Sequence, residues 1–200
     1  MYTTDTKPKP LIVYRTVRLV TPIHLSYSIS GQISLLKNIK KLSFYNTNFS
    51  WEEMGVLSKL PRLEVMKLER SACKGQKWGL KEDETFCRLV FLKFEGVDLE
   101  HWEVNDDNFP KLERLILYDC SRLEEIPSSF EDIQTLKSIK LRRCLLSAVT
   151  SAKKIEESQH DYGNTDMVVI EENTICQVSL LFSFLFFFLK KKVISELHLI

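Results

Sequence analysis

Residues 112–120, LERLILYDC, decide the fold of this chain because the spacing of their leucines recurs along the sequence. The leucines at positions 1, 4 and 6 of this stretch define an apolar pattern that occurs five times, at intervals of 23 to 26 residues. The five copies are Ile39-x-x-Leu42-x-Phe44, Leu63-x-x-Met66-x-Leu68, Leu89-x-x-Leu92-x-Phe94, Leu112-x-x-Leu115-x-Leu117 and Leu136-x-x-Ile139-x-Leu141. Such a period is typical of a solenoid, in which every repeat contributes one short strand and one return segment.

The alternation inside each copy predicts a strand with one buried face. In the first copy, Leu42 and Phe44 alternate with Lys41, Ser43 and Tyr45, which is the period of a half-buried strand. One repeat cannot bury its apolar face alone, so the strands must stack in parallel on their neighbours. The predicted fold is therefore an α/β leucine-rich-repeat solenoid, with parallel strands on the concave face and short helices or irregular segments on the convex face.

The segments that return from one strand to the next carry local signals. Residues 50–53, SWEE, have the spacing of a capping box, and Pro61 is expected to end the helix that follows. Residues 128–131, SSFE, repeat the device. The return segments around residues 81–84 and 105–108 are polar and are expected to be irregular. Position 9 of two repeats holds Cys120 and Cys144, which we interpret as structural residues of a tight turn.

The chain divides into four parts on these patterns. Residues 1–36 read as a degenerate or truncated N-terminal repeat, and residues 37–146 hold the five repeats. Residues 147–172 read as a C-terminal cap made of a helix and a short strand, which would cover the open core of the last repeat. Residues 173–200 form an apolar and basic tail, disordered or atypical in sequence. No comparable cap precedes the repeats, which favours an array that belongs to a longer protein.

The tail raises the question of membrane association. Residues 178–189, VSLLFSFLFFFL, are nearly all apolar and precede three lysines. A helix that spans a bilayer needs about 20 residues, so this run is too short by roughly a third. Membrane insertion through residues 178–192 is therefore the minor alternative to a packed helix or an atypical tail.

Composition argues against several classes of function. The formal net charge is +1, with 28 basic and 27 acidic residues, so no overall field favours nucleic acid. The five cysteines form no C-x-x-C pair, and their odd number fits reduced thiols in an intracellular protein. No histidine stands at ligand or triad spacing, and we expect no enzyme activity, no metal and no cofactor. We expect a cytoplasmic location, with contact to the membrane periphery as the lesser alternative.

A partner would meet the side chains that flank the buried positions. Those side chains point out of the concave face in two rows, at positions 5 and 7 of the repeat. The candidate partner-binding residues are Ser43, Lys67, Lys93, Ile116 and Lys140 in one row, and Tyr45, Glu69, Glu95, Tyr118 and Arg142 in the next. Lys67, Lys93, Glu69 and Glu95 are expected to form a small charge lattice, because neighbouring strands lie about 4.8 Å apart. Two interpretations of this face are open. Its tyrosines are the main contacts to a bound partner, or the face is a solvated surface whose ion pairs are weak.

Four longer stretches resemble the leucine-rich repeats of plant intracellular immune receptors, the nucleotide-binding leucine-rich-repeat (NLR) class. The stretches are residues 60–68 (LPRLEVMKL), 108–115 (NFPKLERL), 120–130 (CSRLEEIPSSF) and the exit at 147–164. The most similar type is the C-terminal region of the late-blight-resistance proteins, which carry a coiled coil at the N-terminus. The resemblance covers roughly residues 33–172 and implies a fragment of such a receptor.

The resemblance implies a role in plant defence. Such receptors are ATP/ADP switches whose repeats restrain the switch and help to sense pathogen effectors, ending in a hypersensitive response. This chain holds no G-x-x-x-x-G-K-[S/T] loop, so the nucleotide site cannot be assigned to any of its residues. We therefore expect a protein-interaction module for effector sensing and autoinhibition, whose partner is a pathogen effector or the receptor's own nucleotide-binding domain. The alternative is a stand-alone repeat adaptor, such as the substrate-recognition part of a ubiquitin ligase.

Overall fold

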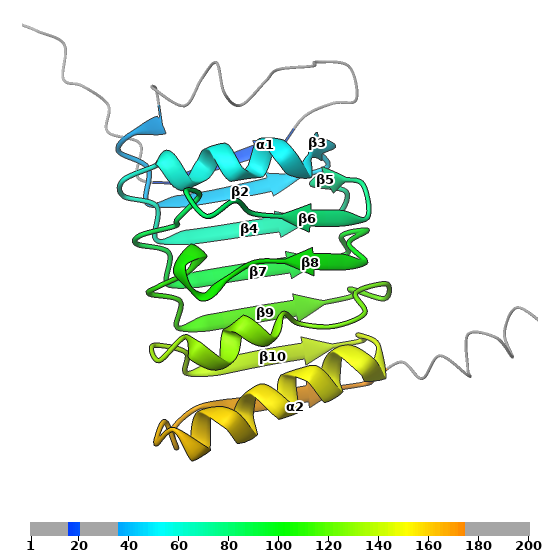
Figure 1. Ribbon diagram of the computed structural model, residues 1–200. Coiled ribbons are helices and arrows are strands. Elements are labelled where there is room, and N and C mark those ends of the chain that lie inside the picture. Colours follow the sequence, from blue (N-terminus) through cyan, green and yellow to red (C-terminus); the bar gives the residue numbers. More distant parts are fainter. Residues whose placement is uncertain (1–15, 21–35, 175–200) are drawn as a thin grey trace, which may run out of the picture.

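Parallel strands stack in chain order into one seven-stranded sheet (Figure 1). The structure is a computed structural model that describes residues 16–20 and 36–174. The strands are β1 Thr16–Val20, β2 Lys41–Tyr45, β4 Val65–Glu69, β7 Phe91–Glu95, β9 Arg114–Tyr118, β10 Ser138–Arg142 and β11 Val168–Glu172. Five of them carry the five copies of the apolar pattern. The predicted α/β leucine-rich-repeat solenoid is confirmed, and β1 adds a strand that the blurred sequence before residue 36 did not predict.

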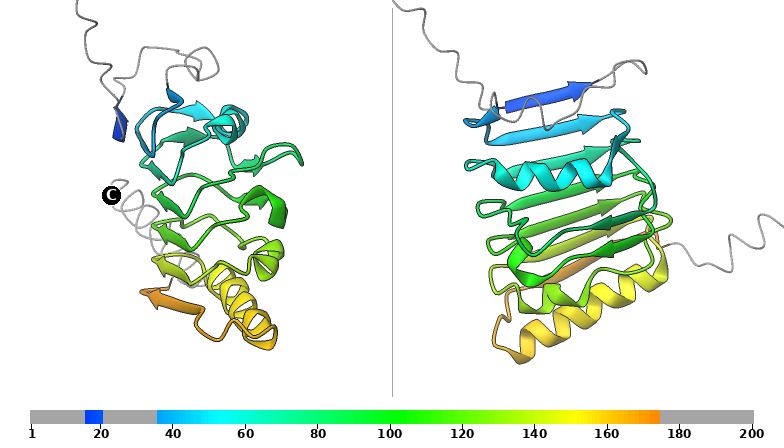
Figure 2. Two further views of the ribbon diagram at one scale, coloured as in Figure 1. Left: turned by 90° about the vertical axis from the view of Figure 1, so that its left-hand side faces the viewer. Right: turned by 45° about the horizontal axis from the view of Figure 1, so that its top comes forward.

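The return segments form a second layer that lies against one face of the sheet (Figure 2). The predicted helix is present as α1, Trp51–Gly55, and continues as a 3-10 helix, Val56–Lys59. Two further 3-10 helices, Asp106–Asn108 and Ser128–Asp132, follow in later repeats. Of the two return segments expected to be irregular, residues 81–84 form a turn without helix or strand, whereas residues 106–108 form a 3-10 helix. The return layer also contains short strands that were not predicted, and they pair in parallel. These pairs are β3 Phe49–Ser50 with β5 Cys73–Lys74, and β6 Lys77–Gly79 with β8 His101–Glu103.

Of the two predicted capping boxes, the first is present and the second is absent. At α1 the backbone N–H of Ser50 donates to Glu53 Oε2 at 3.1 Å, as a capping box requires. The device expected at residues 128–131 is absent, because the segment after Pro127 is a 3-10 helix without a capping side-chain bond. The Ser129 hydroxyl instead donates to the carbonyl oxygen of Val104 at 2.8 Å. That serine therefore ties one repeat to the preceding one.

Each described strand from β2 onward in the large sheet is followed directly by a residue in the left-handed backbone region. These residues are Asn46, Arg70, Gly96, Asp119, Arg143 and Asn173, with φ between 41° and 60°. The left-handed residue turns the chain out of the sheet at the same place in every repeat. Its backbone N–H bonds to the next repeat, as from Gly96 to the Tyr118 carbonyl at 2.9 Å. The turn thus keeps position 7 of all these strands in register.

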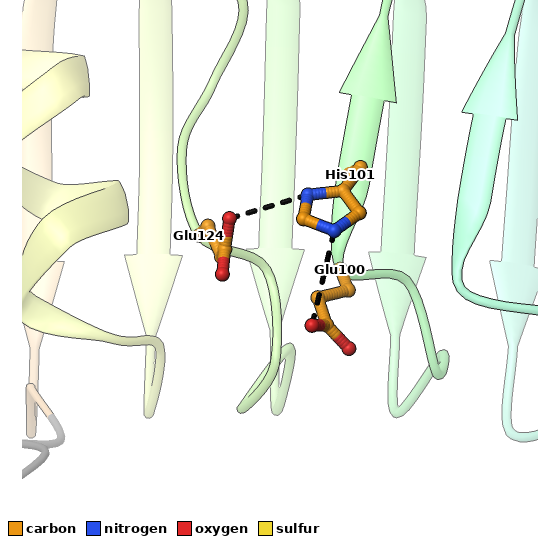
Figure 3. A group of neighbouring side chains, drawn as sticks. All are labelled: Glu100, His101 and Glu124. Carbon is orange, nitrogen blue, oxygen red and sulfur yellow. Dashed lines mark ion pairs between the residues drawn. The ribbon is translucent and has the colours of Figure 1, made fainter.

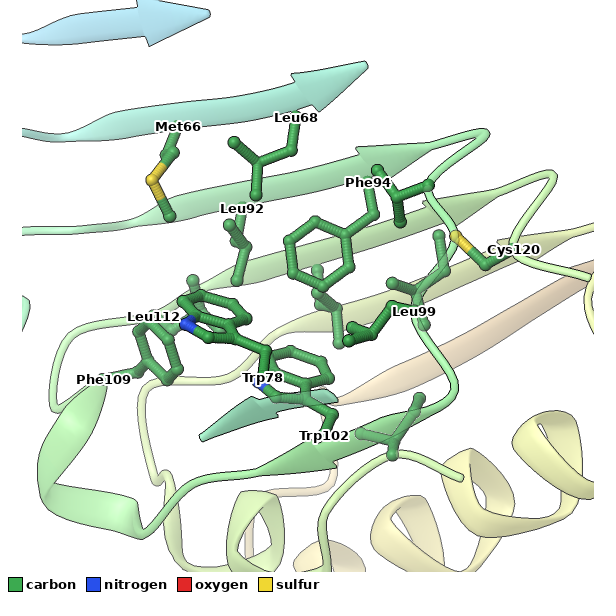
Figure 4. Close-up of a cluster of buried hydrophobic side chains, with 14 of the residues drawn as sticks. Met66, Leu68, Trp78, Leu92, Phe94, Leu99, Trp102, Phe109, Leu112 and Cys120 are labelled. Atoms are coloured by element: carbon green, nitrogen blue, oxygen red, sulfur yellow. The ribbon is translucent and has the colours of Figure 1, made fainter. Parts of the chain in front are cut away.

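Large aromatic side chains fill the space between the two layers (Figure 4). Trp78 stacks on Trp51 and on Trp102, with ring centroids 5.2 Å and 5.8 Å apart. Phe130 continues the series edge-on to Trp102 at 5.1 Å. These rings pack against the apolar row of the sheet, for example Phe94 at 5.8 Å from Trp78. We call Trp51, Trp78, Trp102 and Phe130 the aromatic ladder, and it holds successive repeats at a fixed spacing.

A long helix, α2 Leu146–Asp161, covers the end of the array beside β10 and β11 (Figure 1). Its fully buried Gln159 donates to the carbonyl oxygens of Phe130, Glu131 and Ile133, at 2.7 to 3.2 Å. The amide of Asn164 in turn donates to the Gln159 side-chain oxygen at 2.6 Å. One glutamine side chain thus donates hydrogen bonds to three backbone carbonyl oxygens of the preceding repeat.

The N-terminal part and the C-terminal tail, as divided from the sequence, lie mostly outside the residues that the structure describes. Residues 1–15, 21–35 and 175–200, which include the tail run 178–192, lie outside the described residues. Within the described part, no helix has the length and apolar character needed to cross a membrane.

Candidate partner-binding face

The strand register places the ten predicted face residues in two adjacent rows on the concave side of the sheet. Residue partners across the strands run Ser43, Lys67, Lys93, Ile116, Lys140 in one row, and Tyr45, Glu69, Glu95, Tyr118, Arg142 in the other. All ten side chains are half-buried. The rows follow from the alternation of each strand, because positions 4 and 6 occupy the core and positions 5 and 7 must face away from it.

The predicted charge lattice is centred on Lys93. Its ammonium donates to Glu69 Oε1 at 3.2 Å and also to Glu95. Only 16% of the Lys93 side chain and 17% of the Glu69 side chain are exposed, so these charges are not those of a freely solvated surface. Burial acts to lower the pKa of Lys93, but the bonds from Glu95 and Glu69 outweigh it and raise that pKa above its usual range.

Lys67 does not join the lattice, so that part of the prediction is wrong. Its ammonium lies 5.8 Å from the centre of the Phe91 ring on the neighbouring strand, a cation–π distance. The carboxylate of Glu69 is already bonded to Lys93, which removes the reason for Lys67 to turn toward it.

Three aromatic rings on this face each lie between two cations. In every case one cation comes from the preceding repeat and the other from the following repeat. The three groups are Arg18 and Arg70 on Tyr45 (5.1 and 5.9 Å), Lys67 and Arg114 on Phe91 (5.8 and 5.6 Å), and Lys93 and Arg142 on Tyr118 (5.6 and 4.0 Å). We call them the cation–aromatic groups. They also include residues that the sequence interpretation missed, because it considered strand positions 5 and 7 but not position 3, which has the same parity.

Lys140, Arg142 and Arg143 form a basic end of the array, and their charges are partly neutralised by carboxylates. Lys140 pairs with Glu172 of β11 at 2.9 Å, and hydrogen bonding from Lys140 lowers the pKa of the Glu172 carboxyl. Arg143 pairs with Asp119 and lowers the pKa of that carboxyl by its hydrogen bond. Only Arg142 keeps no carboxylate within 4.0 Å among the described residues, and its guanidinium lies on the Tyr118 ring.

A second cluster of polar side chains lies at β8, in the return layer rather than on the concave face (Figure 3). The two ring nitrogens of His101 lie 3.8 Å from Glu100 and 3.2 Å from Glu124. Carboxylate and imidazole groups are metal ligands in general. Here Arg122 already donates to the Glu100 carboxylate at 2.7 Å, and the side chains of His101 and Glu124 are about half exposed. The cluster is therefore a network of ion pairs on the surface.

The cysteines of the described residues carry free thiols, and three of the four are buried. Burial raises the pKa of the Cys73 thiol well above its usual range. A hydrogen bond with Cys144, together with burial, raises the pKa of Cys120. The same bond lowers the pKa of Cys144, but that thiol is also buried and donates to the carbonyl oxygen of Leu117 at 3.3 Å. Thiols without solvent access are poor nucleophiles, which agrees with the structural role predicted for Cys120 and Cys144.

Comparison with known proteins gives the relatives of this chain. The chain is 34% identical over 174 residues to the late blight resistance protein homolog R1B-11 of Solanum demissum, covering 82% of this chain and 14% of the relative. It is 41% identical over 152 residues to the homolog R1B-12 of the same species, covering 74% of this chain and 11% of the relative. No family model matches the chain.

The matched stretch is a short part of each relative, since the chain spans less than a fifth of the length of either protein. The similarity nevertheless extends over most of this chain, and it agrees with the resemblance noted in the repeat sequences. The chain therefore belongs to the family of the late blight resistance protein homologs.

Proposed function

We propose that this chain is a protein-interaction module of a plant resistance protein, and that its concave face contacts the partner. The observation that carries the proposal is the ordered face itself. Its lysine–glutamate lattice and its cation–aromatic groups are held in place by partly buried contacts, so little side-chain freedom is lost when a partner binds. Tyrosine and arginine are also the side chains that most often dominate the energetics of protein interfaces.

The relatives support the biological setting of the proposal. Their names describe late blight resistance protein homologs, which favours a role in defence for a chain of the same family. The module would act in effector sensing or in autoinhibition, with a pathogen effector or the receptor's own nucleotide-binding domain as the partner. The proposal includes no catalytic step and no cofactor, and it places the chain in the cytoplasm, where free thiols persist.

Co-precipitation from leaf cells tests the proposal. The tagged full chain is expressed together with the portion of R1B-11 that lies outside the matched stretch. We expect recovery of that portion, and reduced recovery with the Tyr118→Ala and Arg142→Ala double variant. The variant Lys154→Gln is the control, because Lys154 is exposed on α2, away from the concave face.

Each other outcome has a defined meaning. Equal recovery with the face variant and the control would refute binding through the concave face. Recovery of ubiquitin-ligase subunits in place of the receptor portion would favour the alternative adaptor function. Sedimentation of the chain with membranes would contradict the cytoplasmic location and would favour an anchor in residues 178–192.

A further inference from the structure

We propose that the concave face binds an acidic, extended segment of a partner protein that runs along the stack of strands. This inference rests on the proposed function and names the chemistry of its partner. It starts from the charges that face outward from the strands β2 to β11. Six are cations, namely Lys41, Lys67, Lys93, Arg114, Lys140 and Arg142. Three are carboxylates, namely Glu69, Glu95 and Glu172, so this face carries a net charge of +3.

The carboxylates of this face all have partners of opposite charge, but several of its cations have none among the described residues. Every one of the three carboxylates is already engaged, Glu69 and Glu95 by Lys93 and Glu172 by Lys140. In contrast, no carboxylate lies within 4.0 Å of Lys67, Arg114 or Arg142 among residues 16–20 and 36–174. Each carboxylate on the described strands of this face therefore already has a cation as its partner, while the face keeps cations that an acidic partner can neutralise.

Aromatic rings position these cations without neutralising them. Lys67 and Arg114 approach the Phe91 ring from neighbouring strands, and Arg142 lies 4.0 Å from the centre of the Tyr118 ring. A ring face attracts a cation through its quadrupole but carries no net charge. The positive charge therefore stays available to a ligand, while the side chain loses part of its freedom before binding. Such preorganisation lowers the entropic cost of association.

The spacing of the cations suits an extended chain. The Lys67 ammonium and the Arg114 guanidinium lie 5.8 and 5.6 Å from the centre of the same Phe91 ring, so the two charges are at most about 11 Å apart. A segment in the extended polyproline II conformation has three residues per turn and rises about 3.1 Å per residue, so carboxylates three residues apart lie on one side of it and span about 9 Å. Ile116 lies between Lys93 and Lys140 in its row and offers an apolar contact beside the cations. The matching segment has acidic residues at every third position and apolar residues between them.

The same face is poorly suited to nucleic acid. A phosphate backbone presents closely and evenly spaced negative charges and is bound by continuous basic surfaces. Here Glu69 and Glu95 stand in the centre of the face, between the cation–aromatic groups. A protein segment can place its few carboxylates on Lys67 and Arg114 and avoid these glutamates.

Binding of designed peptides to the full chain tests the inference. The probe is a labelled peptide of eight residues with glutamate at positions 1, 4 and 7 and leucine or serine elsewhere, and its affinity is measured by fluorescence anisotropy. We expect the Lys67→Gln and Arg114→Gln double variant to bind it about tenfold more weakly. The control Lys154→Gln removes one charge from α2 and should leave the affinity unchanged. Thermal unfolding of all variants verifies that the fold is kept.

Three results would overturn the inference. The first is equal binding of the same peptide with glutamine in place of glutamate. The second is equal binding by the double variant and the wild-type chain. The third is tighter binding of a single-stranded oligonucleotide, with loss of that binding in the same double variant.

The outcome also separates this inference from the proposed function. Peptide binding without co-precipitation of the receptor portion would leave the acidic-segment site in place and refute the receptor portion as the partner. Co-precipitation that Lys67→Gln and Arg114→Gln do not weaken would support that partner and refute binding through an acidic segment.

Discussion

Removing the central ring of the aromatic ladder should cost a large part of the stability of the solenoid. Trp78 is fully buried and stacks on tryptophans of both neighbouring repeats. A tryptophan buries up to about 250 Å², which at about 25 cal/mol per Å² gives an upper bound near 6 kcal/mol. Partial collapse of the neighbouring rings reduces the loss, and core substitutions of this kind typically cost about 3 to 5 kcal/mol. We expect Trp78→Ala to lower the free energy of unfolding by about 4 kcal/mol.

A second substitution at the same position separates ring stacking from the polar atom of the indole. The Trp78 Nε1 is buried and has no hydrogen-bond partner among the described residues, which is unfavourable by itself. Trp78→Phe removes this donor and keeps an aromatic ring between Trp51 and Trp102. We therefore expect a loss of at most about 2 kcal/mol, because relief of the unsatisfied N–H offsets part of the lost volume.

Urea unfolding measures both effects, with circular dichroism for the sheet and tryptophan fluorescence for the ladder. The chain has three tryptophans and all of them belong to the ladder, so the fluorescence reports on this part of the core alone. Tyr162→Ala is the control, since that side chain is 68% exposed. A loss below about 1.5 kcal/mol for Trp78→Ala would refute the ladder as a major source of stability. Equal losses for the alanine and phenylalanine variants would refute the role of stacking.

Two further predictions concern polar contacts. Gln159→Leu leaves the Glu131 carbonyl oxygen without its donor and the Asn164 amide without the acceptor on Gln159, whereas the carbonyls of Phe130 and Ile133 keep backbone donors. It should lower the free energy of unfolding by about 2 to 3 kcal/mol, measured by urea unfolding, with the exposed Glu157→Gln as control. Asp119→Asn removes an ion pair with Arg143 but suits the left-handed turn, which asparagine adopts at other strand ends. Because the pKa of Asp119 is lowered in the folded state, its charge stabilises the fold above the unfolded pKa of about 3.9. That contribution is lost as the pH falls through the folded pKa, so the melting temperatures of wild type and variant should differ at pH 7 and converge near pH 2.

The sheet and its two rows could be predicted from the sequence because strand periodicity is local and strict. Positions 4 and 6 of each repeat are apolar without exception, so the outward direction of positions 5 and 7 follows from the alternation alone. The parallel register then aligns equal positions of neighbouring repeats, as between Lys67 and Lys93. No tertiary information beyond the repeat was needed for this step.

The aromatic ladder could not be predicted in the same way because the return segments differ in length. Trp51 follows position 1 of its repeat by 12 residues, Trp78 by 15 and Trp102 by 13. Insertions in the loops shift the sequence offset but leave the rings stacked in space. The three tryptophans therefore share a position in the structure without sharing one in the repeat pattern. Their recurrence once per repeat was the available signal.

The choice of partners on the concave face also lies beyond the sequence. Lys67 and Lys93 occupy equal positions in neighbouring repeats, and both lie next to glutamates in the register. Only one of them joins the carboxylates, because a lysine can bond two glutamates at once and the Phe91 ring offers the other an alternative. Which of the two lysines bonds the glutamates depends on side-chain conformation, which the periodicity of the sequence does not determine.

The surplus of positive charge on this face is an argument for function rather than for stability. Like charges held on one surface repel each other, and a face selected for stability alone would match each cation with a carboxylate, as Lys140 is matched with Glu172. Lys67, Arg114 and Arg142 have no such partner among the described residues and are fixed by rings that leave their charge intact. Natural proteins keep locally unfavourable features mainly where function requires them. The unmatched cations are therefore where a partner's carboxylates should bind, and neutralising them by substitution should weaken those interactions.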